Sequence, residues 1–476
     1  MNDLNISFIG PSVPNSAPLS GALADPRLTA SGADASLNGL PNELIVQVIV
    51  IIQAIDQSIK SLRSLSLTNR RLNYLVIPSL YESFDPRLGR PWLFLRTLIS
   101  TPQLAQHVKH IHWSDFTESS AIHRPERTAH ELVASALYQR PGIYLKRLSL
   151  ACRDAPRNYG TLLAAAVLYT PRLKSIKAQC AKPASMGVTW IESIQHSSMH
   201  AFEHLRSIVV DSQNAEIDMS ILLSLPSLRM LDVTGLIKIG AFSQHKWSAL
   251  PTGASNVEVL KLRSSTIAAS TLADVVRACR ELRTFLYHHY VAGIGRVPAL
   301  TYSVLGDALK SHSKTLENLA LFGELDDNYA HFPDYRSGYG CMDLRGFPNL
   351  HNLVVSLLAV FEPETHALAI PKNVTHLAMS YAGYIWHIEG FPLSTAQHKA
   401  ICAQSPQLRT LSWCIYDLEE GENDGWEEAQ KACADEGVTF NLTYVPIEGY
   451  TDIEQQQWYT VKGFIQTWED VMTDGR

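Results

Sequence analysis

The sequence has no excess of basic residues. Its 40 Lys and Arg residues are outnumbered by 46 Asp and Glu residues, which gives a formal net charge of -6. Proteins that bind nucleic acid usually carry a basic face, so we expect no nucleic-acid partner. Hydrophobic residues make up 46% of the chain and charged residues 18%, which is typical of a folded protein.

The chain also lacks a long apolar run. No stretch reaches the roughly 18 consecutive apolar residues of a membrane helix, and no basic segment followed by an apolar one opens the chain, as in a secretory signal. The cysteines are scattered, odd in number and without a Cys-x-x-Cys pair, which favours reduced thiols. They are Cys152, Cys180, Cys279, Cys341, Cys402, Cys414 and Cys433. We therefore expect no membrane partner and a cytoplasmic and/or nuclear location.

Strong catalytic motifs are missing as well. There is no Gly-x-x-x-x-Gly-Lys-Ser/Thr, no Gly-x-Ser-x-Gly and no His-Glu-x-x-His. Glu192, His196, His200 and His204 recur at intervals of four and would share one face of a continuous helix, where zinc could bind them. The polar outer face of a short helix explains them more simply. We predict no catalytic residue, no metal and no cofactor.

Against these absences stands an apolar stretch over residues 37–84. Pro41 in Leu40-Pro41-Asn42-Glu43-Leu44 suits the first turn of a helix, where its missing N–H costs nothing. The apolar residues that follow are too dense for one buried stripe, and two more short helical patterns complete the segment. Three helices in about 45 residues cannot bury all of this surface. Part of it is expected to contact a partner.

This stretch resembles the F-box family, whose pattern begins Leu-Pro-x-Glu-Leu/Ile and continues with paired aliphatic residues. The matching residues are Leu40, Pro41, Glu43, Leu44, Val48, Ile49, Leu62, Leu65, Leu67, Arg71 and Leu75. The resemblance implies binding to the Skp adaptor of a cullin-RING ubiquitin ligase. The implied adaptor-binding residues are Leu40, Pro41, Glu43, Leu44, Val48, Ile49, Leu62 and Leu65. The alternative is a three-helix piece of ordinary core that happens to begin Leu-Pro.

The flanking segments have different compositions. Residues 1–36 are rich in Ser, Pro, Gly, Ala and Asn, which predicts a disordered arm. Residues 85–104 follow with Pro, Gly and then a helical pattern, which predicts a helical linker. The aromatic residues in 446–476 predict a tail that caps the last part of the fold.

A Leu-x-x-Leu-x-Leu pattern recurs through residues 105–445, about every 30 residues. It appears as VKHIHW from Val108, LKRLSL from Leu145, LKSIKA from Leu173, LRSIVV from Leu205, LRMLDV from Leu228, VEVLKL from Val257, LRTFLY from Leu282, LENLAL from Leu316, LHNLVV from Leu350, VTHLAM from Val374 and LRTLSW from Leu408. Helix-like segments separate many of these hexamers, for example 127–139, 160–168, 188–195, 271–279, 302–312 and 395–402. The predicted fold class is an α/β solenoid, an irregular leucine-rich-repeat array with parallel strands on its concave face. Segments 344–350 and 436–440 resemble parts of large fungal F-box proteins.

The predicted concave face carries the residues between the apolar hexamer positions. From the N-terminal end these are His110, His112, Arg147, Lys177, Asp211, Asp232, Lys261, Arg263, Leu286, His288, Phe322 and Val354. An aromatic loop over 326–345 interrupts the array, and so long a loop is usually functional or disordered. The predicted substrate-binding residues are Lys261, Arg263, Leu286, His288, Phe322, Tyr329, Tyr335 and Val354. The alternative is binding by a convex or terminal surface.

These patterns predict a substrate-recognition subunit of an SCF-type ubiquitin ligase. The F-box would dock on the Skp adaptor, and the repeat body would hold a protein target. The chain itself would not be an enzyme, because other subunits transfer ubiquitin. A non-ligase repeat scaffold for protein–protein interaction is the alternative, and a hydrolase has little support in the sequence.

Overall fold

The computed structural model describes most of the chain between residues 37 and 445. The described ranges are 37–56, 59–85, 91–113, 127–154, 159–179, 190–195, 200–212, 217–236, 250–289, 300–323, 341–362, 367–382, 393–416 and 426–445. The predicted arm over 1–36, the predicted tail over 446–476 and most of the predicted aromatic loop lie outside these ranges.

The described chain begins with three helices that share a small core of their own. After a 3-10 turn, η1 (Leu37–Gly39), the helices are α1 (Asn42–Asp56), α2 (Ile59–Ser66) and α3 (Arg70–Leu80). Asn69 caps α3, since its side-chain oxygen accepts the Leu72 backbone N–H at 2.8 Å. The buried residues of this core are Ile45, Ile49, Leu62, Leu72 and Val76. We call these three helices the helical unit.

The rest of the described chain is organised on one sheet of twelve strands. Its spatial order follows the sequence, and every neighbouring pair is parallel. The strands are β1 (Ser83–Phe84), β2 (His110–Trp113), β3 (Ser175–Gln179), β4 (Ser207–Asp211), β5 (Met230–Thr234), β6 (Val259–Ser265), β7 (Thr284–His289), β8 (Asn318–Gly323), β9 (Asn352–Ser356), β12 (His376–Ala382), β13 (Thr410–Tyr416) and β14 (Thr439–Val445). β10 (Phe361–Glu362) and β11 (Ala367–Leu368) form a separate antiparallel pair.

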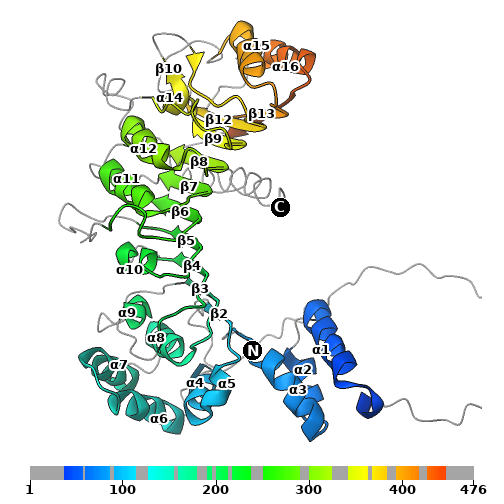
Figure 1. Cartoon of the computed structure of the whole chain (residues 1–476), viewed down its shortest axis with the longest axis vertical. Coiled ribbons are helices and arrows are strands. Elements are labelled where there is room, and N and C mark those ends of the chain that lie inside the picture. Colours follow the sequence, from blue (N-terminus) through cyan, green and yellow to red (C-terminus); the bar gives the residue numbers. More distant parts are fainter. Residues whose placement is uncertain are drawn as a thin grey trace, which may run out of the picture.

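Helices alternate with these strands, which makes the architecture α/β. They are α4 (Pro91–Ser100), α5 (Pro102–Ala105), α6 (Arg127–Tyr138), α7 (Ile143–Asp154), α8 (Tyr159–Tyr169), α9 (Trp190–Gln195), α10 (Met219–Leu223), α11 (Ala269–Ala278), α12 (Tyr302–Leu309) with the 3-10 turn η2 (Lys310–His312), α14 (Leu357–Val360), α15 (Thr395–Gln404) and α16 (Trp426–Asp435). Figure 1 shows α8 to α12 along one side of the sheet, with the helical unit at its N-terminal end. No helix in the described ranges has the length and apolar character needed to cross a membrane.

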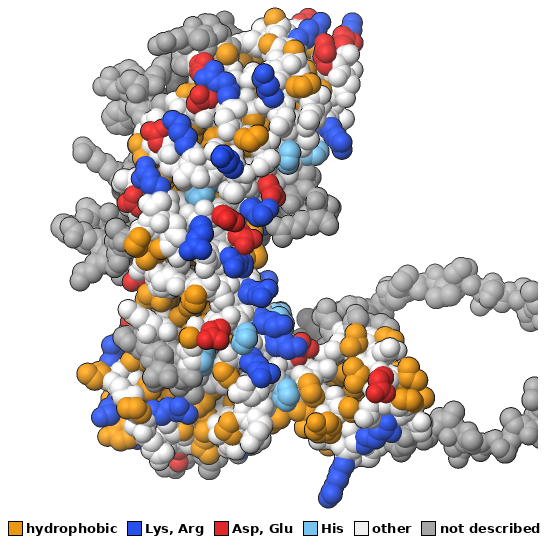
Figure 2. All heavy atoms as spheres, in the orientation of Figure 1, with side chains coloured by type: hydrophobic (Ala, Val, Ile, Leu, Met, Phe, Trp, Pro, Cys, Tyr) orange, Lys and Arg blue, Asp and Glu red, His pale blue; other side chains and the backbone are white. Residues whose placement is uncertain are grey.

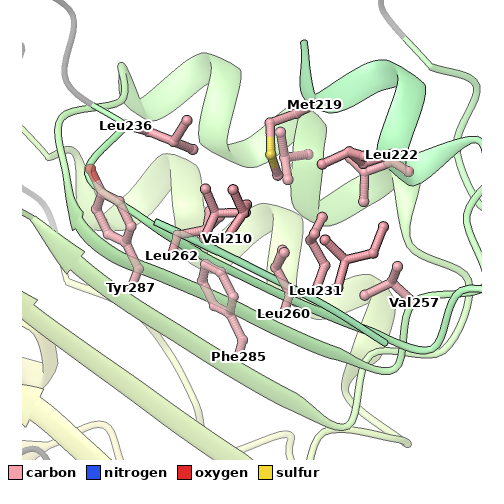
Figure 3. Packing of buried hydrophobic residues seen from close by; sticks show 14 of the residues in the cluster. Val210, Met219, Leu222, Leu231, Leu236, Val257, Leu260, Leu262, Phe285 and Tyr287 are labelled. Carbon is pink, nitrogen blue, oxygen red and sulfur yellow. The ribbon is translucent and has the colours of Figure 1, made fainter. Parts of the chain in front are cut away.

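The hexamer pattern is explained by the side chains that point from the sheet towards the helices. Leu231, Leu260 and Phe285 occupy one register row of neighbouring strands, and each is fully buried. Figure 3 shows them packed below Met219 and Leu222 of α10. Each such leucine contributes about 1.5–3 kcal/mol of stability through burial. The alternation of these residues with others along each strand therefore fixes which face is covered.

One hexamer prediction is wrong. Leu145 to Leu150 lies in helix α7 and not in a strand, and β2 pairs directly with β3. The reason is that Leu145, Leu148 and Cys152 lie at helical spacing and are buried together, and Ser149 Oγ donates to Ala134 O of α6 at 2.6 Å. Arg147 is consequently exposed on a helix and does not belong to the face of the sheet. In each of the other ten hexamers, the last four residues lie in a strand.

Candidate interaction surfaces

Most of the exposed large apolar residues of the described chain lie in the helical unit. Its exposed large apolar residues are Leu37, Leu40, Leu44, Val46, Val50, Ile51, Leu67 and Tyr74. Hydrophobic side chains are correspondingly prominent on this unit in Figure 2. Exposed apolar surface of this kind marks interaction sites.

The residues that the sequence assigned to adaptor binding divide into two groups. Leu40, Pro41, Glu43 and Leu44 are exposed at the start of α1, and Val48 and Leu65 are half-buried. Ile49 and Leu62 lie in the core of the unit, with 1% and 4% of their surface exposed. The first group can touch a partner directly. Ile49 and Leu62 instead pack the helices together. They would affect docking only indirectly, by maintaining the structure of the helical unit.

A side chain of α3 fixes the exposed start of α1. The Arg71 guanidinium donates to Asn42 Oδ1 at 2.8 Å and to the Leu40 carbonyl oxygen at 2.5 Å. Hydrogen bonds from a charged donor are stronger than neutral ones. Leu40 and Leu44 are therefore presented from a backbone that is tied to a second helix.

The helical unit joins the sheet through β1. The Glu82 carbonyl oxygen accepts the backbone N–H groups of Lys109 and His110 at 2.8 and 3.0 Å, and the Glu82 carboxylate pairs with Lys109 Nζ at 2.7 Å. The buried Phe84 ring stacks on Phe94, with ring centres 3.9 Å apart. Partial burial opposes ionisation of Glu82, but Lys109, Gln53 and His110 together outweigh this effect, and the pKa of the carboxyl is lowered.

The face of the sheet that points away from the core residues changes character along the strands. His112 and Lys177, at the N-terminal end, are exposed, and Lys261 is half-buried. The next strands carry Leu286 and Val354 on this face, with 0% and 1% exposure. On the described strands this face is therefore accessible at its N-terminal end and again at β14, where Asn441 is exposed in the same register row as Val354.

The predicted substrate-binding residues are distributed accordingly. Arg263 is half-buried and forms a two-pronged ion pair with Asp232 across β5 and β6, at 2.9 and 3.1 Å. His288, like Leu286 and Val354, is buried. A residue so buried cannot touch a partner in this conformation. The Phe322 side chain, Tyr329 and Tyr335 lie outside the described part of the structure.

A buried polar cluster lies at the carboxyl ends of β6 and β7. The Ser264 backbone N–H donates to His288 Nδ1 at 3.3 Å, and the Tyr287 hydroxyl lies 2.8 Å from His289 Nδ1. Burial lowers the pKa of His288 to about 4, helped by His289 and Arg263, and lowers that of His289 to about 4. Ser264 Oγ is 3.4 Å from the same Nδ1. Because the backbone N–H already uses that nitrogen, we assign the cluster a structural role and no proton transfer.

The histidines spaced by four residues do not share a helix face. Helix α9 ends at Gln195, and His196 lies outside the described ranges. His200 Nε2 is 3.2 Å from the Val167 carbonyl oxygen, and the imidazole packs edge-on against Phe202. Within the described residues, no group of three or more His, Cys, Asp or Glu is placed to hold a metal ion.

A second surface feature is a polar cleft where α3 meets the first strands. Its volume is about 710 Å³. The residues lining it are Pro78, Ser79, Glu82, Gln106, His107, Lys109, Arg172, Lys174, His204 and Arg206. Lys, Arg and His side chains gather in this region in Figure 2. We call it the basic cleft.

Sequence reasoning missed the basic cleft, although the hexamers contain its signal. The second residue of each hexamer stands just before a strand, and its carbonyl oxygen accepts two N–H groups of the next strand in most of the sheet. This position is basic in four consecutive strands, at Lys109, Lys174, Arg206 and Arg229. The sequence prediction used the apolar positions of the hexamers and did not compare their second residues.

Comparison with known proteins adds no assignment. No family model matches the chain, and no curated protein matches it.

Proposed function

We propose that this chain is the substrate-recognition subunit of an SCF-type cullin-RING ubiquitin ligase. The helical unit would be the F-box that docks on the Skp adaptor. The observation that carries this proposal is the exposed apolar surface around Leu40 and Leu44, on a unit whose own core is complete. In a small unit, an apolar surface that is exposed in the isolated chain is commonly covered by a partner in the complex.

The body would be an irregular leucine-rich-repeat solenoid that holds a protein target. Three features support this finer description: the strand order that follows the sequence, the parallel pairing, and the leucines that repeat in register. Each strand and its connection bury their apolar residues mainly against the neighbouring ones. Of the predicted target-binding residues, Lys261 and Arg263 remain accessible enough to contribute.

No bond chemistry is assigned to this chain. It would accelerate ubiquitin transfer by holding a target lysine near the charged ubiquitin, which raises the effective concentration of the reacting groups. The alternative, a non-ligase scaffold, is favoured by the continuity between the helical unit and the sheet at β1, which would also suit a simple cap of the array.

The test is co-purification of the full chain with the Skp adaptor. Leu44 is 44% exposed, so Leu44→Asp should leave the core of the helical unit intact. We expect the native chain to retain the adaptor and Leu44→Asp to lose it. Ile143→Asp is the matched control, because Ile143 is an exposed apolar residue (82%) on α7, outside the helical unit. Absence of adaptor binding by the native chain would refute the ligase proposal and favour the scaffold.

A further inference from the structure

The basic cleft holds three cations without acidic partners. Arg172, Lys174 and Arg206 are exposed, and among the described residues no carboxylate pairs with any of them. The one carboxylate lining the cleft, Glu82, is paired with Lys109. A site with a surplus of about three positive charges attracts anions.

The geometry of this charge follows from the sheet. Lys109, Lys174 and Arg206 occupy equivalent positions before β2, β3 and β4, and the carbonyl of each is bonded to the next strand. Neighbouring strands lie about 4.8 Å apart, so the first and last of these three backbone positions are about 10 Å apart. Two residues earlier in each segment stand His107, Arg172 and His204, which line the same cleft. Lysine, arginine and histidine side chains thus form a short double row.

Ion pairs neutralise the charged residues at both ends of this row. At β1 and β2, Glu82 neutralises Lys109 at 2.7 Å. At β5 and β6, Glu258 lies 3.3 Å from Arg229 and 4.0 Å from Arg283, and Glu317 pairs with Arg283 at 2.6 Å. The uncompensated charge is therefore confined to the segment before β3 and β4.

We propose that the basic cleft binds a phosphorylated segment of a partner protein. A phosphate monoester carries a charge of about -1.5 to -2 and three acceptor oxygens, which suit Arg and Lys donors. The uncompensated Lys174 and Arg206 precede the neighbouring strands β3 and β4, with backbones about 4.8 Å apart, so both side chains and that of Arg172 can reach one phosphate group. The cleft is an open strip along the sheet and not an enclosed pocket of the kind that surrounds a compact ligand. The proposal does not depend on adaptor binding.

Nucleic acid fits the same charges less well. Tight binding of nucleic acid requires many phosphate contacts, whereas this row spans three strands and the formal net charge of the whole chain is -6. An oligonucleotide is therefore a competitor to be tested and not the proposed ligand.

The probe is a fluorescein-labelled peptide with one phosphoserine in a glycine background, measured by fluorescence anisotropy with the full chain. We expect Lys174→Glu with Arg206→Glu to weaken binding at least about tenfold, since two charge-assisted contacts become repulsive. Arg409→Glu is the matched control. Arg409 is exposed at the equivalent position before β13, at the far end of the sheet, and should leave affinity within about twofold.

Several results would overturn the proposal. They are equal loss in the Arg409 control, equal binding of a peptide with glutamate in place of the phosphoserine, tighter binding of inositol hexakisphosphate than of the peptide, and tighter binding of a single-stranded oligonucleotide of equal charge. Lys174→Gln with Arg206→Gln, checked by thermal unfolding, provides a variant without charge reversal. It should also weaken the peptide, and unchanged affinity in this variant would equally contradict the site.

Discussion

Buried histidines connect neighbouring strands and helices in this protein. His312 is an example: its Nδ1 accepts the Leu282 backbone N–H at 3.3 Å, and its Nε2 lies 2.9 Å from the Val276 carbonyl oxygen. One nitrogen must accept and the other donate, which is possible only for the neutral ring. Burial accordingly lowers the pKa of His312. The His312 ring therefore joins two backbone groups, one through each nitrogen, and it can do so only while the ring stays neutral.

At the residue scale this predicts acid sensitivity. His288 and His289 have pKa values of about 4 in the folded protein, against about 6.5 in an unfolded chain. Well above pH 6.5 these histidines are neutral in both states. As the pH falls from 6.5 to 4, the unfolded chain binds protons that the folded protein refuses, so the free energy of unfolding decreases, by up to about 1.4 kcal/mol per pH unit for each histidine.

The measurement is urea unfolding of the full chain at several pH values between 7 and about 4.5. His288→Gln with His289→Gln should flatten the dependence of the unfolding free energy on pH, whatever it does to the absolute stability. An unchanged slope in this variant would show that other groups control the acid response.

At the element scale, the C-terminus of α16 is the clearest example of a local sequence signal that ends a helix. The Val438 N–H bonds to the Cys433 carbonyl oxygen at 2.9 Å and the Gly437 N–H to that of Ala434 at 3.0 Å, which is the Schellman pattern. Gly437 has φ of 75°, a conformation in which a Cβ is strained. Nothing lies within 4 Å of the position that a Cβ would occupy there.

We therefore expect Gly437→Ala to lower the free energy of unfolding by about 1 kcal/mol through backbone strain alone. Gly346→Ala is the control, because that position is equally open and its φ is not in the left-handed region. Urea unfolding of both variants measures the difference. Equal effects would contradict the assignment of the cost to the positive φ.

The elements also show what the sequence could reveal. The strands with an apolar residue at hexamer positions one, four and six were predictable, because those side chains must alternate between faces. The hexamer at Leu145 failed because positions one and four also lie on one face of a helix. Tyr144 and Cys152, outside the hexamer, decide the matter by extending the helical stripe. A strand of two residues such as Ser83–Phe84 has no periodicity to detect.

The candidate surfaces were predictable to a different degree. The exposure of Leu40 and Leu44 follows from a helix with too many apolar residues to bury. The burial of Leu286 and Val354 could not be read from alternation, which gives the face of a strand but not what else covers it. The basic cleft requires Arg172 and Arg206 to be brought together by strand pairing, and pairing is a non-local property.

At the scale of the whole molecule, Phe84 connects the helical unit to the body. Its ring is buried, stacks on Phe94 and lies 5.7 Å from the Trp113 ring. Phe84→Ala removes these contacts and leaves a cavity, so we expect a loss of about 3–5 kcal/mol. We also expect the helical unit to unfold at a lower temperature than the sheet.

Calorimetry and limited proteolysis of the full chain test this prediction. Leu67→Ala, at a position 76% exposed on the same unit, should change stability by no more than about 0.5 kcal/mol. A single unchanged transition for Phe84→Ala would mean that the unit is attached by other contacts.

The direct pairing of β2 with β3 has a consequence for how such a chain can vary. Helices α6, α7 and α8 intervene between these strands, yet the register runs from His110 opposite Ser175 to Trp113 opposite Ala178 without a break. The pairing of two neighbouring strands thus does not depend on the length of the segment that connects them. Insertions on the helical side can lengthen, shorten or be exchanged while the row of cations at the strand starts keeps its spacing. In this architecture, new sequence can accumulate between the strands without moving the residues that line the basic cleft.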